Sequence, residues 1–380
     1  MNSFISDYIA IVADSTNNNW QDNYDSYRFG PEGPKAVTTQ EPFLLSVPRK
    51  LLKMAGLITA GSAHQERNQF CEELKAALQC YTPYLENVEW LYANLSDQES
   101  RQILCSVLAY RAMGYKKIKL PLSTTDYWDQ IREIQDSVKD AELIDPGFLD
   151  LKLCKMRLDA YGYPLEIFYT PKGVVTNFVL QQYRCLTPNG VIEAEYGDTV
   201  LDCGGCWGDT ALYFAHKAGD KGNVYSFEFV PTNLDIWKRN IRLNPELKER
   251  IHLVEAPVWS ESGEPLFIEG AGPGSRVVSE SSLSDSIEVK TISIDDLVKE
   301  QNLDNVSFIK MDIEGSELAA LQGAENTLRR HRPKLAVCVY HDLEDFWKIP
   351  QFIDGLGLGY RFYLRHFTIH AEETVLFAEV

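Results

Sequence analysis

The sequence has no excess of basic residues, and this absence already limits its partners. Lysine and arginine together number 37 against 55 aspartate and glutamate residues, so the 380-residue chain carries a formal net charge of −18. Proteins that bind nucleic acids gain much of their affinity by neutralising phosphates with basic side chains. We therefore expect no nucleic-acid partner.

Long hydrophobic runs and a secretory signal are also missing. No apolar run reaches the roughly 18 residues that indicate a membrane span, and no lysine or arginine precedes the short apolar stretch within residues 1–20. The eight cysteines are spread along the chain without a dense framework, a pattern typical of reduced thiols. These absences predict a cytoplasmic protein with no membrane partner.

Internal repeats are absent too, but the residue pattern changes along the chain. Before residue 166 the apolar residues recur at helical spacing, which predicts helices over Gln65–Leu78, Glu86–Leu95 and Glu99–Met113. We predict a mainly helical N-terminal domain over residues 1–165 and a second domain over residues 166–380. The first either covers the substrate or forms a dimer contact, so a second copy of the chain is also an expected partner.

Strands and helices alternate in the second domain. The predicted strands are Thr199–Cys203, Asn223–Glu228, Ile251–Val254, Val306–Met311, Leu335–Tyr340, Tyr360–Leu364 and Thr374–Ala378, and the predicted helices include Asp209–Ala218, Asn233–Leu243 and Glu317–Arg330. Such alternation predicts an α/β fold with a mostly parallel seven-stranded sheet, covered on both faces. The last two strands lack a helix between them and are expected to form an antiparallel pair at the edge. A polar insertion, Glu261–Ser286, predicts a solvent loop or a lid.

A glycine-rich turn follows the first of these strands, in the sequence VLDCGGCWGDT (200–210). Glycines let a ligand approach the backbone closely, and the next helix offers unpaired N–H groups. The dinucleotide pattern G-x-G-x-x-G is absent, because Cys206 replaces its second glycine. The carboxylate of Asp202 would repel a pyrophosphate, but it suits a ligand with an ammonium group. The turn therefore predicts a site for the methionine part of S-adenosylmethionine (SAM).

The second strand ends in an acid, Glu228, which can accept hydrogen bonds from both ribose hydroxyls of an adenosine. Asn233 is expected to support this loop. The predicted cofactor-binding residues are Asp202, Gly204, Gly205, Gly208, Thr210, Glu228 and Asn233.

Two acids and a histidine follow neighbouring strands further along the chain. Asp312 and Glu314 are two residues apart at the end of one strand, so they share a side while the chain is extended. His341 ends the next strand and is expected beside Asp312. A histidine titrates near neutral pH and can take a proton from a nucleophile.

Other ionisable residues nearby are given smaller roles. Glu317 is interpreted as an acid that complements the dipole of its helix. His366 and His370 follow the penultimate strand and are weaker candidates for the substrate side.

Together these segments resemble the FkbM-type SAM-dependent methyltransferases. The resemblance rests on VLDCGGCWGDT, FEFVPTNLDIWKRNIRLN, TISIDDL, IKMDIEGSE, AVCVYH and ETVLFAEV, in that order, and extends to the segment between Glu89 and Leu122. It implies a doubly wound sheet with SAM at the first two strand ends, and methyl transfer to hydroxyls of sugars or natural products. KMDIEG differs from the Asn/Asp-Pro-Pro-aromatic signature of enzymes that methylate nucleic-acid amino groups.

We therefore expect O-methylation of a small hydroxylated acceptor by in-line transfer. His341 is predicted to act as the base, Asp312 to orient the reactants and Glu314 to assist, without a metal. Two alternatives stay open. The same three residues could hold Mg²⁺ and orient a diol, or the chain could bind SAM as a non-catalytic partner protein.

Overall fold

The computed structural model describes residues 3–14, 19–30, 72–270, 272–278 and 287–380. The chain divides into two compact units. The first comprises Met1–Tyr92, Leu104–Thr124 and Ile369–Ala371, and the second Ala93–Ile103, Thr125–Thr368 and Glu372–Val380.

Helices build the first unit. They are α1 (Phe4–Asp14), α2 (Ser26–Phe29), the 3₁₀ helix η2 (Thr82–Tyr84), α5 (Leu85–Asn94) and the later part of α6 (Gln98–Met113). The last two confirm the predicted helices Glu86–Leu95 and Glu99–Met113. Residues 72–79 are also helical, whereas the earlier part of the predicted helix Gln65–Leu78 lies outside the described residues.

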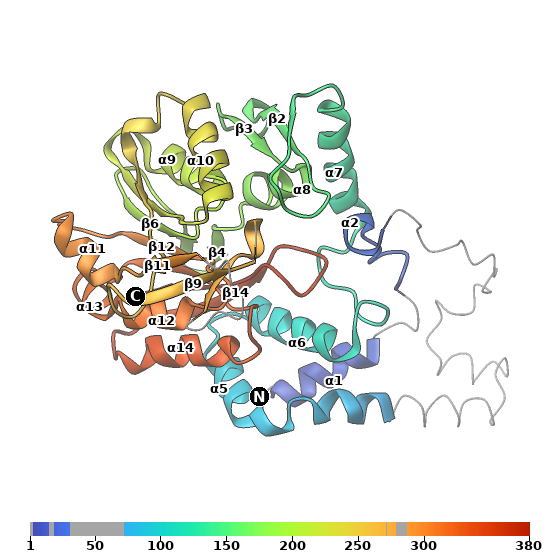
Figure 1. Cartoon of the computed structure of the whole chain (residues 1–380). Helices are drawn as coiled ribbons and strands as arrows, with labels where there is room; N and C mark the ends of the chain where they lie inside the picture. Colours follow the sequence, from blue (N-terminus) through green and yellow to red (C-terminus); the bar gives the residue numbers. More distant parts are fainter. Residues whose placement is uncertain (1–2, 15–18, 31–71, 271, 279–286) are drawn as a thin grey trace, which may run out of the picture. The chain divides into compact units, whose positions relative to one another are not determined.

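A seven-stranded sheet forms the centre of the second unit (Figure 1). Its strands, in spatial order, are β14 (Arg361–His366), β15 (Thr374–Glu379), β13 (Lys334–Cys338), β12 (Phe308–Met311), β6 (Thr199–Cys203), β7 (Asn223–Phe227) and β8 (Ile251–Val254). The run from β13 to β8 is parallel, and β15 is antiparallel to both of its neighbours. The predicted mostly parallel sheet and its antiparallel final pair are confirmed.

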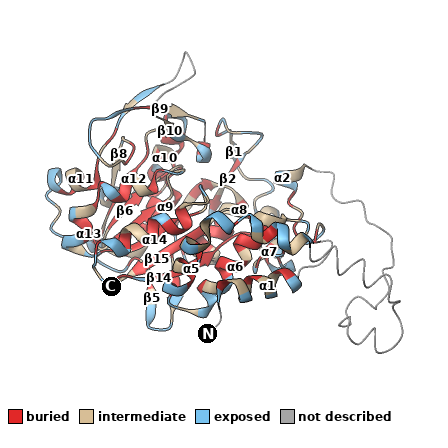
Figure 2. Cartoon of the chain, turned by 90° about the horizontal axis from the view of Figure 1, so that it is seen from below, coloured by how far each residue is buried: buried red, intermediate tan, exposed pale blue. Residues whose placement is uncertain are grey.

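Helices cover both faces of this sheet. Figure 1 shows α9 (Asp209–Ala218) and α10 (Pro231–Leu243) on one face, and α12 (Glu317–Gln322), α13 (Glu325–His331) and α14 (Asp345–Gly355) on the other. Strand β12, Lys310 included, is therefore buried along its whole length, and β13 is buried after its first residue, as expected for a doubly wound sheet. Figure 2 shows the same burial along β6 and β15.

The predicted single helix Glu317–Arg330 is wrong, because α12 and α13 are separate helices with Gly323 between them. A Cβ atom on Gly323 would lie 2.2 Å from the carbonyl oxygen of Trp259. The backbone approach is thus so close that only glycine fits.

The polar insertion is also more ordered than predicted. It contains β9 (Pro265–Glu269), the 3₁₀ helix η7 (Gly272–Gly274) and β10 (Arg276–Val278), and β9 pairs antiparallel with both β10 and β11 (Glu288–Lys290). A loop is therefore the wrong description for its described residues.

Smaller elements complete the second unit. They are α7 (Thr125–Ser137), β1 (Leu143–Ile144), β2 (Leu153–Arg157), η3 (Asp159–Tyr161), β3 (Glu166–Tyr169), α8 (Pro171–Val174), the π-helix η4 (Val175–Val179), β4 (Cys185–Thr187), β5 (Gly190–Ile192), η5 (Gly219–Lys221), η6 (Lys248–Arg250) and α11 (Ile294–Glu300).

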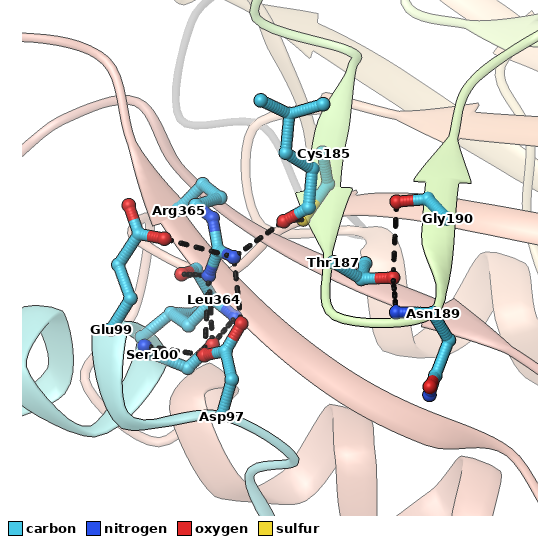
Figure 3. Close-up of polar contacts among 10 residues, drawn as sticks. Asp97, Glu99, Ser100, Cys185, Thr187, Asn189, Gly190, Leu364 and Arg365 are labelled. Carbon is cyan, nitrogen blue, oxygen red and sulfur yellow. Dashed lines mark hydrogen bonds and ion pairs between the residues drawn. The ribbon is translucent and has the colours of Figure 1, made fainter.

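Arg365 on β14 links three of the second unit's segments (Figure 3). Its guanidinium forms ion pairs with Asp97 at 2.7 Å and Glu99 at 3.1 Å, and donates to the carbonyl of Leu186 on β4 at 2.7 Å. The residue is 8% exposed. The start of α6 and the β4–β5 hairpin are thereby fixed to the edge strand.

The strand order reverses between β6 and β12. From β6 the chain moves outward to β7 and β8, then returns to form β12 and β13 on the other side. In open α/β sheets, ligands bind at the carboxyl ends of the strands at such a reversal. None of the helices in the described ranges is long and apolar enough to cross a membrane.

Candidate functional site

The glycine-rich turn between β6 and α9 lies at this reversal, and its glycines are required by close contacts. Gly204 has φ +92°, and a Cβ atom there would lie 2.0 Å from the carbonyl oxygen of Asp312. At Gly205 a Cβ would lie 2.2 Å from Ser226 Oγ, and Gly208 has φ +82°. The turn is therefore packed directly against the ends of β7 and β12.

A buried ion pair holds this turn. The Asp202 carboxylate, which is fully buried, lies 3.2 Å from Lys310 Nζ on β12 and accepts hydrogen bonds from Thr210 at 3.0 Å and Ser226 at 2.9 Å. Lys310 also donates to the carbonyl of Gly204 at 2.5 Å. Its pKa is raised because the charges of Asp202 and nearby acids outweigh burial, which alone would lower it.

These contacts bear on the predicted cofactor-binding role of Asp202 and Thr210, which stays a prediction. Both were expected to line the methionine part of a ligand, but the structure pairs the Thr210 hydroxyl with the Asp202 carboxylate and gives that carboxylate a lysine as its cation. Their contacts position the turn. The Oδ1 atom of Asp202 is buried and accepts no hydrogen bond from the described residues.

Glu228 and Asn233 form a polar pair beyond β7. The Glu228 carboxylate accepts from the backbone N–H groups of Phe229 at 2.6 Å and Val230 at 2.7 Å, and from the Asn233 side chain at 3.2 Å. Burial raises the pKa of Glu228 to about 7, although these hydrogen bonds lower it. The Asn233 side-chain oxygen is buried and accepts no hydrogen bond from the described residues. The pair thus presents acceptors to a ligand that carries hydroxyl donors.

Asp312 follows β12, and hydroxyl groups surround it. Tyr340 donates to one carboxylate oxygen at 3.1 Å and Tyr183 to the other at 3.3 Å. The pKa of each tyrosine is raised well above its usual range by burial and by the charge of Asp312. Both hydroxyls therefore remain protonated donors.

His341 lies where the sequence predicts, beside Asp312. Its Nε2 atom is 3.5 Å from carboxylate oxygens of both Asp312 and Glu314, and its Nδ1 atom is 3.1 Å from Glu317. Burial would lower its pKa, but hydrogen bonds to Glu314 and Glu317 and the charges of Glu317 and Asp312 raise it to about 11. The surrounding carboxylates therefore favour the imidazolium form of His341, and only the neutral form can take a proton or bind a metal ion.

Glu317 has a larger role than the sequence indicated. It is completely buried and accepts from the backbone N–H groups of Ile313 at 2.8 Å and Gly315 at 3.0 Å. It therefore holds the loop after β12 and fixes the ring of His341 from the other side. Its position at the start of a helix gave no signal of this contact.

Glu373 is a second residue that sequence reasoning missed. It precedes β15, has a left-handed backbone with φ +59° and accepts a hydrogen bond from Gln182. Burial and the charge of Asp312 raise its pKa to about 8. The charge of His341 lowers this pKa, so Glu373 is electrostatically linked to both members of the Asp312–His341 pair.

The two weaker histidine candidates are held by internal contacts. His366 Nδ1 lies 2.9 Å from Thr374 Oγ1 on the neighbouring strand. His370 is fully buried in the first unit, where its ring nitrogens lie 2.8 Å from the Tyr110 hydroxyl and 3.3 Å from Asp25. Both rings are thus held by internal contacts, and their role on the substrate side stays a prediction.

A cation could bind at the His341 cluster. One ligand atom each from Asp312, Glu314 and His341 lie within 4.8 Å of one another. Two carboxylates and one imidazole suit Mg²⁺ or Mn²⁺.

Residues 194–362 match the family model described as the methyltransferase FkbM domain. Hexuronic acid methyltransferase AglP from Haloferax volcanii is 32% identical over 139 residues, which cover 36% of this chain and 54% of that protein. The chain therefore spans about half the length of this curated relative.

Solved structures also match. Methyltransferase FkbM from Methylobacillus flagellatus KT has 20% identity and a TM-score of 0.49, covering 80% of this chain and 61% of that chain. Fibrillarin from Aeropyrum pernix in complex with SAM has 13% identity and a TM-score of 0.33, covering 50% of this chain and 70% of that chain.

Proposed function

Because residues 194–362 belong to the FkbM methyltransferase family, we propose that the protein transfers the methyl group of SAM to a hydroxyl of a sugar or similar small molecule. The proposal rests mainly on one observation. Three features lie where the strand order reverses, namely the glycine-rich turn, the Glu228–Asn233 pair and the Asp312–His341 cluster. The sugar-acting relative and the net charge of −18 favour a sugar over a nucleic acid as acceptor.

The residues present fit SAM. The Glu228 carboxylate and the unpaired Asn233 oxygen accept hydrogen bonds, which suits the two donating hydroxyls of a ribose. Gly204, Gly205 and Gly208 keep the turn free of side chains. Bound SAM supplies an activated methyl group on a positively charged sulfur.

The cluster around His341 is suited to the acceptor. Asp312 holds its two tyrosine hydroxyls and faces the imidazole, so it can orient an incoming hydroxyl group. The positively charged sulfur of SAM would lower the pKa of His341 if it lay beside this cluster, because like charges repel. In its neutral form His341 could accept the proton of the acceptor hydroxyl, with Glu314 and Asp312 stabilising the charge.

Calorimetric titration with SAM and with S-adenosylhomocysteine tests the cofactor site. We expect micromolar binding by the wild type and a loss of at least about tenfold in Glu228→Gln, whose amide keeps the shape of the side chain but accepts fewer hydrogen bonds. The exposed Glu255→Gln is the matched control. Folded wild-type protein that binds neither compound contradicts the proposal.

Methyl transfer to hydroxylated sugars then tests the reaction. We expect His341→Ala to retain SAM binding and to lose transfer. Full activity in this variant contradicts the base assignment. If no acceptor is methylated although SAM binds, the remaining alternative is a SAM-binding partner protein without catalysis.

A divalent cation is a second candidate for activating the acceptor, favoured by the convergence of ligand atoms from Asp312, Glu314 and His341 within 4.8 Å. Such an ion would bind the acceptor oxygens directly and lower the pKa of the hydroxyl. Electron paramagnetic resonance of added Mn²⁺ distinguishes the two, since we expect bound Mn²⁺ in the wild type and free Mn²⁺ with Glu314→Gln. No bound Mn²⁺ in the wild type leaves the metal-free route.

A further inference from the structure

Glu373 is a carboxylate near the proposed transfer site to which the proposed reaction gives no role. In the antiparallel pairing of β15 with β13, the Val339 N–H donates to the carbonyl of Thr374 at 3.0 Å. Continued by one residue, this register sets Glu373 opposite Tyr340, whose hydroxyl donates to Asp312 at 3.1 Å. The backbone pairing therefore brings Glu373 to the strand ends at which Asp312 lies.

Two consecutive residues, Gln182 and Tyr183, contact both of these carboxylates. The Gln182 amide donates to Oε2 of Glu373, and the Tyr183 hydroxyl donates to Oδ2 of Asp312 at 3.3 Å. Gln182 is 2% exposed, and its N–H donates to the carbonyl of Thr176 in the π-helix η4 at 3.1 Å. One turn, anchored to η4, thus holds Glu373 and Asp312 at the same edge of the sheet.

The second carboxylate oxygen of Glu373 is left for a ligand. Within the described ranges this carboxylate accepts a hydrogen bond at Oε2 alone and forms no ion pair. The residue is half-buried, and its Oε1 atom is not among the enclosed atoms that lack a partner. The neighbouring Asp312 and Glu314 side chains keep 21% and 29% of their surface exposed, so this end of the sheet is accessible.

The backbone around this opening is unusual. Glu373 has φ +59°, and both Gln181, which precedes the anchored turn, and Glu314 have φ +55°. Left-handed backbone is unfavourable for residues that carry a Cβ atom, and such residues cluster at ligand sites. The strain agrees with a role of Glu373 beyond folding.

The charges at this end of the sheet distinguish between acceptors. His341 is paired with three carboxylates, those of Asp312, Glu314 and Glu317. No lysine or arginine in the described ranges forms an ion pair with these acids or with Glu373. A carboxylate on an acceptor would therefore meet like charges, which disfavour the wrong partner.

A hydroxyl group suits the same surroundings. Burial and the charge of Asp312 raise the pKa of Glu373 to about 8, although Gln182 and His341 lower it. A hydroxyl both donates and accepts hydrogen bonds, so it can pair with Glu373 whether or not the carboxyl group carries a proton.

We propose that Glu373, held by Gln182, binds a second hydroxyl of the acceptor, and that the acids at this end of the sheet exclude acceptors that carry a carboxylate. The preferred acceptor is then an uncharged sugar with at least two free hydroxyls, in place of a uronic acid. The inference rests on the proposed function, because it names the substrate class and a specificity-determining residue of the same site.

Calorimetric titration of the full chain, saturated with S-adenosylhomocysteine, compares matched acceptors. The probes are the methyl glycosides of glucose, galactose and mannose, each beside the glycoside of its uronic acid, which differs by one carboxylate. We expect at least one neutral glycoside to bind, at least about tenfold more tightly than its uronic acid counterpart. This comparison uses the wild type, so misfolding of a variant cannot obscure it.

Glu373→Leu tests the residue itself, because leucine keeps the bulk of the side chain but forms no hydrogen bond. We expect the Kd of the best neutral glycoside to rise by at least about tenfold, with that of S-adenosylhomocysteine changed less than about twofold. Glu373→Gln keeps a hydrogen-bonding oxygen and should restore most of the affinity. Glu255→Leu, at an exposed ion pair with Lys238, is the matched control.

The outcomes separate failure of the inference from failure of the function. Equal or tighter binding of the uronic acid glycosides overturns the exclusion of carboxylates. An unchanged Kd in folded Glu373→Leu overturns the assignment to Glu373. Wild-type protein that binds S-adenosylhomocysteine but no neutral glycoside overturns the inference and leaves the cofactor site intact, whereas protein that does not bind S-adenosylhomocysteine overturns the proposed function as well.

Discussion

At the scale of single residues, charge compensation decides what each group at the strand ends does. Asp202 and Lys310 neutralise each other inside the protein, whereas His341 is the one imidazole among Asp312, Glu314 and Glu317. A carboxylate that is already paired holds the fold. A carboxylate that has no paired cation is available to a ligand or a proton.

Glu317→Gln tests the arrangement around His341. The substitution removes the negative charge 3.1 Å from Nδ1, so we expect the pKa of His341 to fall from about 11 by at least about one unit. Titration of the imidazole C–H signals by nuclear magnetic resonance measures the shift, with His341→Gln to assign them. Glu344→Gln is the control, because Glu344 pairs with Lys348 at the surface. An unchanged pKa in Glu317→Gln contradicts the assignment of Glu317.

Lys310→Met tests the buried ion pair. Methionine has a similar volume, so the main effect is an unpaired Asp202 carboxylate, and we expect unfolding to need about 3–5 kcal/mol less free energy. Denaturant titration measures this difference. Lys238→Met breaks an exposed pair with Glu255 and should cost less than about 1 kcal/mol. Similar losses in the two variants would mean that Lys310 is not the compensating charge.

At the scale of elements, the turn after β6 depends on how closely it approaches β12. We expect Gly204→Ala to force the two strand ends apart, because its Cβ would meet the Asp312 carbonyl at 2.0 Å. Gly263→Ala is the matched control, since its φ of +85° is similar but no atom lies within 4 Å of the added Cβ.

The two alanine variants separate backbone strain from the contact. Strain at positive φ costs about 1–2 kcal/mol and applies to both, whereas the clash adds to Gly204→Ala alone. Denaturant unfolding should therefore show a clearly larger loss for Gly204→Ala, accompanied by weaker binding of S-adenosylhomocysteine. Equal losses in stability would refute the importance of the contact.

The elements also show how far the sequence could predict the structure. The short apolar runs of β6 and β8 and the helical spacing in α9 predicted these three elements to the residue. It missed the break at Gly323, which depends on the carbonyl of Trp259 far along the chain. The sheet formed by β9, β10 and β11 was hidden by the polar composition of its connecting turns.

The candidate site was also predicted only in part. Asp312 and His341 were predicted to be neighbours because parallel strands end at one edge, and their 3.5 Å separation confirms it. Glu373 and the Lys310–Asp202 pair were not predicted. Both arise from contacts across strands whose order a single sequence does not reveal.

At the scale of the whole molecule, several titrating groups shift in one direction. Burial raises the pKa of Asp209 and of Asp345 to about 6, of Glu228 to about 7 and of Glu373 to about 8. The pKa of His341 is raised to about 11 by its surrounding carboxylates. These shifts add protons to the folded protein in the neutral range, and the pKa values of His216, His252 and His331, which burial lowers, act in the opposite direction.

This excess of bound protons sets the sign of the pH dependence. A group whose folded pKa is raised stabilises the protein fully below its unfolded pKa and loses that contribution as pH rises through the folded value. For Glu228 the loss runs from about pH 4.5 to about pH 7, and for His341 from about pH 6.5 to about pH 11. The negative net charge of the chain grows over the same range and adds repulsion in the same direction.

We therefore expect the free energy of unfolding of the ligand-free protein to fall by at least about 2 kcal/mol between about pH 5 and pH 9. Denaturant titrations at intermediate pH values measure the profile. Glu228→Gln should flatten its lower half, because an amide does not titrate, whereas Glu255→Gln, at an exposed pair, should leave it unchanged. Burial raises the pKa of Asp97, but hydrogen bonds from Arg365 and Ser100 lower it overall. The stability that Asp97 contributes is lost only in more acidic solution, so it does not mask the fall. A stability that stays level between about pH 5 and pH 8 would mean that these buried acids have already lost their protons at lower pH in the folded protein.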